Sequence, residues 1–308
     1  MTFLAPTCAA PEPVWPANAR LGEGLCWSVG QQALYWVDIL GERLYRMDWP
    51  ARTRHEWRFD ETISAVAERC AAPGLVVALR HRVACFDPRD GTLEVLHEAE
   101  ADRPGNRFND GKCDPQGRFW VGSMDTACKA PTGSLYRVDA GERSIVRVWA
   151  DNFPVNNGPA WSPDGRTMWL NDTARNVVHR ADFDAVRGTL SAVAPWLRLA
   201  RGDGYPDGMT TDRDGRLWIA HWAGGCVTCH AGDDGRELAR IERADLDFLI
   251  DVLEEESSSD RDYYVDRDTL DYLAERGAEA SLLTALRRGL GAREEMDFRW
   301  EEAGQVPG

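Results

Sequence analysis

Five polar residues recur along the first two thirds of the chain, and each of them precedes a small residue. The five are Glu23, Ser64, Asp110, Asn157 and Asp207. Glycine follows four of them, and alanine follows the second. Equivalent positions of a repeat point toward a common axis, so these side chains are expected to converge. Carboxylate and amide oxygens without Cys or His are the donors that Ca²⁺, Mg²⁺ or Mn²⁺ prefer. A metal site is one interpretation, and turn chemistry is the other, because Asn-Gly and Asp-Gly are common turn dipeptides.

The elements that must position these residues are short strands. Each copy has a polar residue, a small residue, a short apolar run, a turn and a second strand, which is usually aromatic, as in Leu217-Trp218-Ile219. The small residues stand at positions 24, 65, 111, 158 and 208, so neighbouring copies are 41 to 50 residues apart. Short strands at this period are typical of propeller blades. The sequence predicts an all-β propeller over 1–242, with five recognisable blades that start near 21, 62, 107, 155 and 205.

Composition narrows the possible partners. The 308 residues carry a net charge of -15, with 51 acidic and 36 basic side chains, so nucleic acid and anionic membranes are expected to be repelled. No apolar run approaches the roughly 20 residues that a membrane helix needs. We see no basic, apolar leader in residues 1–16 and therefore expect a cytoplasmic protein.

Residues 243–308 differ from the rest of the chain. They hold 18 acidic and 8 basic side chains, whereas 12 of the 13 tryptophans precede them. Leucines at helical spacing predict an acidic helix over 245–256 and a break over 257–260. Two further helices are expected: one over 269–276 with Asp268 as its N-cap and Gly277 after its end, and one over 278–290.

The motifs around the repeated positions resemble those of the regucalcin and gluconolactonase (senescence marker protein-like) family over roughly residues 14–242. The resemblance rests on four motifs in the expected order: Leu21-Gly22-Glu23-Gly24, Arg107-Phe108-Asn109-Asp110-Gly111-Lys112, Asn157-Gly158-x-x-Trp161-Ser162 and Pro206-Asp207-Gly208-Met209.

This resemblance implies a six-bladed propeller that hydrolyses a sugar lactone with one divalent cation, which could be Ca²⁺, Zn²⁺, Mn²⁺, Mg²⁺ or Fe²⁺. Glu23, Asn157 and Asp207 would bind the metal, and Asp207 would also act as the general base. Arg107 and Asn109 would hold substrate oxygens. Some relatives carry an acidic residue at a position that corresponds loosely to Asp125, which is therefore a further substrate-binding candidate.

The family pattern stops after Glu242. The motifs of a sixth blade are missing, so the acidic, mainly helical segment 243–308 is expected to replace that blade. Five blades could close on themselves, or the tail could plug the gap. The alternative to a lactonase is a non-catalytic propeller, a cation-binding or interaction module that lost turnover together with its sixth blade.

Two other features each have a functional and a structural interpretation. Cys226, Cys229 and His230 have the spacing of a haem attachment motif, but they also fit a strand followed by a turn. His221 follows an aromatic strand, where it could face the channel mouth or serve a structural role.

Overall fold

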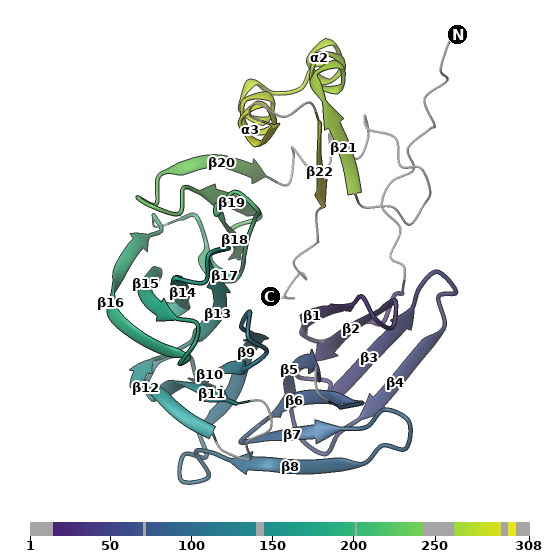
Figure 1. Ribbon diagram of the computed structural model, residues 1–308, viewed down its shortest axis with the longest axis vertical. Coiled ribbons are helices and arrows are strands. Elements are labelled where there is room, and N and C mark those ends of the chain that lie inside the picture. Colours follow the sequence, from purple (N-terminus) through teal and green to yellow (C-terminus); the bar gives the residue numbers. More distant parts are fainter. Residues whose placement is uncertain are drawn as a thin grey trace.

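The structure is a computed structural model, and it describes residues 15–69, 72–139, 145–200, 202–242, 262–290 and 295–299. Five four-stranded antiparallel sheets follow one another around a common axis (Figure 1). The first strand of each sheet is innermost, and it packs against the first strand of the next sheet. The predicted all-β propeller with five recognisable blades is confirmed.

The strands follow the chain in simple order within every blade. Blade 1 contains β1 (Gly22–Ser28), β2 (Ala33–Asp38), β3 (Arg43–Asp48) and β4 (Arg54–Arg58). Blade 2 contains β5 (Ile63–Glu68), β6 (Leu75–Leu79), β7 (Arg82–Phe86) and β8 (Leu93–Glu98). Blade 3 contains β9 (Asn106–Cys113), β10 (Phe119–Asp125), β11 (Gly133–Val138) and β12 (Ile145–Phe153). Blade 4 contains β13 (Asn156–Trp161), β14 (Thr167–Asp172), the 3-10 turn η1 (Thr173–Arg175), β15 (Val177–Asp184) and β16 (Thr189–Arg198). Blade 5 contains β17 (Tyr205–Thr211), β18 (Leu217–Trp222), β19 (Cys226–His230) and β20 (Glu237–Glu242).

An aspartate organises the first hairpin of blades 3 and 5. The Asp114 carboxylate accepts hydrogen bonds from the backbone N–H of Arg118 at 3.0 Å and from the indole N–H of Trp120 at 2.9 Å. Asp212 accepts the corresponding bonds in blade 5, at 3.0 Å from the Arg216 N–H and at 2.9 Å from the indole of Trp218. The aspartate in these repeats therefore holds the turn against the aromatic strand.

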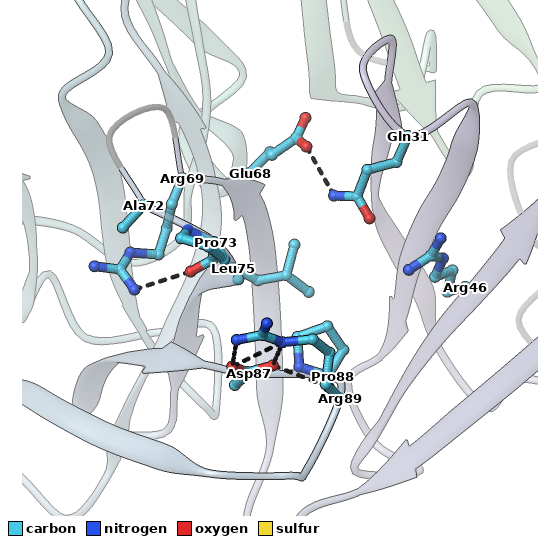
Figure 2. Close-up of a pocket in the computed structure, with 11 residues that line it drawn as sticks. Gln31, Arg46, Glu68, Arg69, Ala72, Pro73, Leu75, Asp87, Pro88 and Arg89 are labelled. Atoms are coloured by element: carbon cyan, nitrogen blue, oxygen red, sulfur yellow. Dashed lines mark hydrogen bonds and ion pairs between the residues drawn. The ribbon is translucent and has the colours of Figure 1, made fainter.

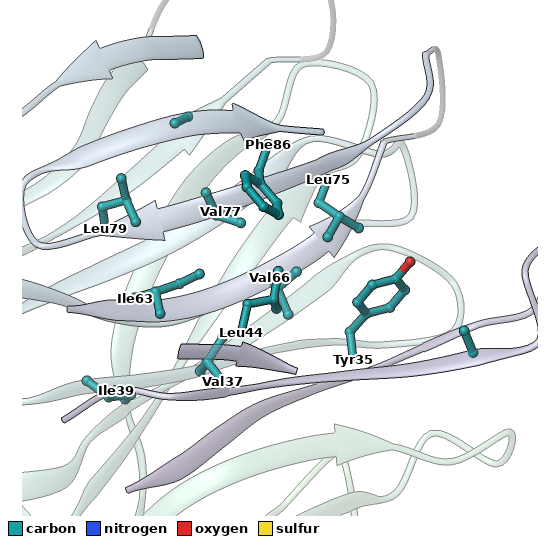
Figure 3. Close-up of a cluster of buried hydrophobic side chains, with 12 residues drawn as sticks. Tyr35, Val37, Ile39, Leu44, Ile63, Val66, Leu75, Val77, Leu79 and Phe86 are labelled. Carbon is teal, nitrogen blue, oxygen red and sulfur yellow. The ribbon is translucent and has the colours of Figure 1, made fainter. Parts of the chain in front are cut away.

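Apolar side chains fill the space between neighbouring blades. Val37 of β2 and Ile63 of β5 belong to one cluster between blades 1 and 2, which Tyr35 of β2 and Leu75 and Val77 of β6 extend (Figure 3). All five are at most 1% exposed. Because each blade buries one face against the next, the blades act as one scaffold that fixes the positions of the inner strands.

The segment after the fifth blade contains strands as well as helices. β21 (Asp262–Asp266) pairs with β22 (Glu295–Arg299), and α2 (Arg267–Glu275) and α3 (Ala280–Leu290) lie between them in sequence. The helices expected over 269–276 and 278–290 are therefore present, whereas the helix expected over 245–256 lies outside the described residues.

The predicted N-cap of the first of these helices is wrong. Asp266, and not Asp268, caps α2, because its carboxylate accepts hydrogen bonds at 2.7 Å from both the backbone N–H and the hydroxyl of Thr269. Asp268 lies within the first turn, where its negative charge interacts favourably with the helix dipole.

These C-terminal elements lie in the sector between blade 5 and blade 1 (Figure 1). Helix α3 packs against β20, the outer strand of blade 5. The elements also have a hydrophobic cluster of their own, which includes Val265, Leu273 and Leu286. A helical unit with a two-stranded sheet thus stands where a sixth four-stranded blade is expected. In the described ranges, no helix has the length and apolarity needed to cross a membrane.

Candidate active site

The structure places the five repeat-equivalent polar residues on the five innermost strands. Glu23 lies on β1, Ser64 on β5, Asp110 on β9, Asn157 on β13 and Asp207 on β17. Neighbouring inner strands are joined near these positions. The Asp110 carboxylate accepts a 3.0 Å hydrogen bond from the backbone N–H of Gly158, and the Asn171 side chain donates to the carbonyl of Asp207. Oxygen donors from separate blades therefore lie at one end of the propeller axis, which we call the channel mouth.

Burial raises the pKa of the two carboxyl groups proposed as metal ligands. Glu23 has a pKa of about 8, because burial disfavours its charged form and because Asp207 and Asp110 repel it. Asp207 has a pKa of about 6 for the same two reasons, burial first and then repulsion by Asp110. Both residues are half-buried. The mouth is thus an acidic site that a cation would stabilise.

Asp110 and Lys112 continue this site along β9. Burial raises the pKa of Asp110, and the Lys112 ammonium partly offsets that effect. The Lys112 ammonium donates a 2.8 Å hydrogen bond to the carbonyl of Met209. Lys112 therefore places a positive charge beside Asp110 while it bridges β9 and β17.

Arg107 and Asn109 form a polar chain that ends at Asn157. The Arg107 guanidinium donates to the amide oxygen of Asn109 at 2.7 Å, and the Asn109 amide nitrogen donates to the amide oxygen of Asn157 at 2.7 Å. The Asn109 amide nitrogen also donates to the Asn156 carbonyl at 2.9 Å. The proposed substrate-binding pair and a proposed metal ligand are consequently parts of one hydrogen-bonded network.

Asp125 lies at the end of β10, but loop backbone groups engage its carboxylate. It accepts hydrogen bonds from the N–H groups of Ala127, Lys129 and Ala130 at 3.2, 3.0 and 2.8 Å. These bonds, that from Ala130 above all, lower its pKa. Asp125 shapes the loop 125–130 in the structure, and a direct contact with substrate stays a prediction.

The strand interpretation of the Cys226, Cys229 and His230 motif is confirmed, because all three lie on β19. The His230 imidazole bonds the Gly235 carbonyl at 3.0 Å and the Thr228 hydroxyl at 2.8 Å. His221 is also buried, and its ring bonds the Asp203 carbonyl and the Thr228 hydroxyl, each at 2.7 Å. Both histidines are therefore held inside blade 5, which favours a structural role for them.

The donor chemistry fits a divalent cation only if an amide oxygen takes part. Among the described residues, no group of three or more His, Cys, Asp or Glu side chains gathers as a metal site does. The carboxylates of Glu23 and Asp207 repel each other. A cation bound between them would need the amide oxygen of Asn157 as its third ligand. The resulting set of two carboxylates and one amide oxygen suits an oxygen-seeking cation.

Sequence reasoning missed Thr173 and Lys112. Asn157 and Asn171 are paired across β13 and β14, so the residues at the end of β14 lie beside the mouth. Thr173 follows directly and accepts a 3.0 Å hydrogen bond from the Asn157 amide nitrogen. The position of Lys112 directly after the Asp110-Gly111 pair is the signal that could have found it.

A second, charged cavity of about 280 Å³ lies between blades 1 and 2 (Figure 2). Gln31 lines it just beyond the far end of β1, so the cavity opens on the face opposite Glu23. Two of its arginines are paired with carboxylates, Arg46 with Asp48 and Arg89 with Asp87, each at 2.6 Å. These two arginines therefore already have carboxylate partners.

Comparisons with known proteins agree with this architecture. A family model described as "SMP-30/Gluconolactonase/LRE-like region" matches residues 21–245. L-arabinolactonase from Azospirillum brasilense is 35% identical over 223 residues, which cover 72% of this chain and 73% of that protein. 6-Deoxy-6-sulfogluconolactonase from Pseudomonas putida is 36% identical over 225 residues, 72% of this chain and 75% of its own. The solved structure of regucalcin, a calcium-binding protein from Agrobacterium tumefaciens, superposes with a TM-score of 0.69 at 28% identity over 79% of this chain and 80% of that one.

Proposed function

Because the chain belongs to the SMP-30/gluconolactonase/LRE-like family, we propose that it is a hydrolase that opens a sugar lactone to the corresponding aldonic acid. Two similar proteins bear the names of sugar lactonases. The observation that carries the proposal is the arrangement at the channel mouth. Two carboxylates and an amide oxygen from three separate blades lie beside a hydrogen-bonded arginine and asparagine.

Glu23, Asn157 and Asp207 are the residues that would hold a divalent cation. A cation bound there would polarise the lactone carbonyl and lower the pKa of a water molecule. The raised pKa values of Glu23 and Asp207 support this assignment, because closely spaced buried carboxylates need a positive charge to be ionised together. Which cation the site selects, among Ca²⁺, Zn²⁺, Mn²⁺, Mg²⁺ and Fe²⁺, is a question for titration.

Asp207 is the proposed general base. In the cation-free protein, burial and the charge of Asp110 raise the pKa of Asp207 to about 6, which makes the carboxylate a stronger base that is still largely ionised at pH 7. Pro206 and Asp207 are held in place by donors from blade 4, Thr173 and Asn171. The carboxylate is therefore carried by a segment with fixed geometry.

Arg107 and Asn109 are the proposed substrate-binding residues. The guanidinium has five N–H donors, and the contacts to Asn109 and to the Phe108 carbonyl both involve Nη1. The rest of this planar group can bind ring or hydroxyl oxygens of a sugar. The loop shaped by Asp125 follows β10, which pairs with the strand that carries Arg107, so it would form one wall of the substrate pocket.

The experiment is hydrolysis of glucono-, galactono-, xylono- and arabinono-lactones, followed as acid release in the presence of divalent cations. We expect the wild type to turn over at least one lactone. Asp207→Asn should lower kcat by at least about 100-fold, in the range for loss of a general base. Asp182→Asn is the matched control, because Asp182 is an exposed aspartate on β15, and its activity should equal that of the wild type.

A non-catalytic, cation-binding propeller is the second candidate. The observation that favours it is the C-terminal unit in the sixth sector. Because this unit replaces a four-stranded blade, that side of the site differs from the corresponding side of a six-bladed propeller. Cation binding without hydrolysis of any of the four lactones would support this second function and contradict the first.

A further inference from the structure

Thr173 connects the proposed metal ligand Asn157 to the segment that carries Asp207. It is the first residue of η1 and is 5% exposed. Its hydroxyl lies 2.7 Å from the carbonyl oxygen of Pro206 and 3.0 Å from the amide nitrogen of Asn157. One hydroxyl thus bridges blade 4 and blade 5 directly beside the channel mouth.

Counting hydrogens fixes the direction of each of these bonds. The Pro206 carbonyl can only accept, so the single hydroxyl hydrogen of Thr173 points to it. The Thr173 oxygen must then accept from Asn157, and only the NH₂ group of that amide can donate. The amide oxygen of Asn157 is consequently turned away from Thr173.

The hydrogen bonds on the opposite side of the Asn157 amide require the same orientation. Its oxygen receives a hydrogen bond from the Asn109 amide nitrogen, whose own orientation is set by the Asn156 carbonyl and the Arg107 guanidinium. A flipped Asn157 would set two NH₂ groups against each other and leave its oxygen facing a hydroxyl without a hydrogen to give. Such a mismatch in a buried site is costly.

We propose that Thr173 is a positioning residue that orients the Asn157 carboxamide, so that the amide oxygen is available to a divalent cation. The proposal rests on the metal site of the proposed function. Asn109 occupies one lone pair of that oxygen, and the second remains for the cation. Thr173 itself touches neither the cation nor the substrate. Loss of outer partners of metal ligands typically lowers metal affinity 10- to 100-fold.

The test is calorimetric titration of the full chain, stripped of metal, with Ca²⁺ and with Mn²⁺. Thr173→Val keeps the shape of the side chain but cannot accept the amide hydrogen, and we expect its dissociation constant to rise about 10- to 100-fold. Thr173→Ser retains the hydroxyl and should bind within about threefold of the wild type. Thr211→Val is the matched control, because it removes a similar 2.6 Å bond between a threonine hydroxyl and the Trp161 carbonyl without touching Asn157.

An Asn157→Asp background separates orientation from general stability. A carboxylate presents an oxygen on both sides and needs no orienting partner, so adding Thr173→Val there should change cation affinity less than about threefold. An equal loss in both backgrounds would show that Thr173 only links the strands, and wild-type affinity in Thr173→Val would show that it does not act on the site; either result overturns the proposal. A wild type that binds neither cation would instead refute the proposed metal site itself.

Discussion

Carboxyl groups at the channel mouth affect the ionisation of the proposed ligands: Asp110 and Asp207 raise the pKa of Glu23, and Asp110 raises that of Asp207. Glu23, Asp110 and Asp207 lie on separate inner strands, and burial together with mutual repulsion raises the pKa of each of the two proposed ligands. Arg107 lowers the pKa of Glu23, but its own pKa is lowered by burial. The effect of Arg107 on Glu23 is smaller than that of burial and of the two neighbouring carboxylates, which is the physical basis for proposing a cation there.

Asp110 should raise the pKa of the proposed general base, Asp207. Because its charge raises the pKa of Asp207, Asp110→Asn is expected to move the acid limb of the pH profile of kcat/KM to lower pH. The shift is toward lower pH because the Asp110 charge repels the ionised Asp207, and removing that charge makes Asp207 easier to ionise. The measurement is the pH dependence of lactone hydrolysis, with Asp182→Asn as the control. A limb that stays in place, or that moves to higher pH, would contradict this role.

Each inner strand carries a small residue directly after its polar residue, but the local requirement for it differs between blades. Gly158 has φ +77°, and a β-carbon there would lie 2.6 Å from the terminal methyl of Met209. Gly208 holds the equivalent position in blade 5, where a β-carbon would meet nothing within 4 Å. The repeated glycine is thus a conformational requirement in blade 4 and not in blade 5.

Alanine substitution should therefore separate the two glycines. Gly158→Ala is expected to lower the free energy of unfolding by about 1–2 kcal/mol, because an L-residue is disfavoured in the left-handed region. Gly208→Ala is the matched control and should change it by less than about 0.5 kcal/mol. Urea denaturation of both variants measures the difference, and equal effects at the two positions would refute the argument.

Local patterns predicted the blades well because each hairpin is specified by nearby residues. The Asp-x-x-x-Arg-x-Trp pattern of Asp212 to Trp218 contains both the turn and the strand that it stabilises. The beginning of α2 was misplaced for the opposite reason. Residues 262–266 extend as β21 because they pair with β22, about 30 positions away, so Asp266 becomes the cap. Thr173 was missed because its partner Pro206 belongs to the next blade.

At the scale of the whole molecule, the sixth sector is the part of the ring that departs from five-fold repetition. The C-terminal unit packs through α3 on β20 and has its own core. The four motifs of the mouth come from blades 1, 3, 4 and 5, so the ligand set does not depend on residues of a sixth blade. The proposed activity requires only that blades 1 and 5 keep their present separation.

The stability of the cation-free protein should depend on pH. The native pKa values of Glu23 and Asp207, about 8 and about 6, exceed the values of 4.5 and 3.8 for these groups without the fold. The native state then binds more protons than the unfolded state between about pH 4 and 8, so the free energy of unfolding should fall as pH rises through this window. Urea denaturation with chelator at pH 5 and pH 8 measures this change.

Two comparisons make the pH result specific. Glu23→Gln should reduce the loss of stability toward pH 8, because it removes the group with the largest shift. Addition of a divalent cation at pH 8 should restore stability to the wild type by binding the native state. Stability that rises with pH in the chelated wild type would contradict the electrostatic description of the mouth.

The most direct test of the central claim is acid release from the four-lactone panel by the metal-stripped wild type, before and after stepwise addition of a divalent cation. The account predicts no turnover by the stripped protein and recovery that saturates near one equivalent of cation per chain. Turnover that persists without cation would contradict the metal-dependent mechanism. Saturable cation binding with no turnover of any lactone would contradict the lactonase itself.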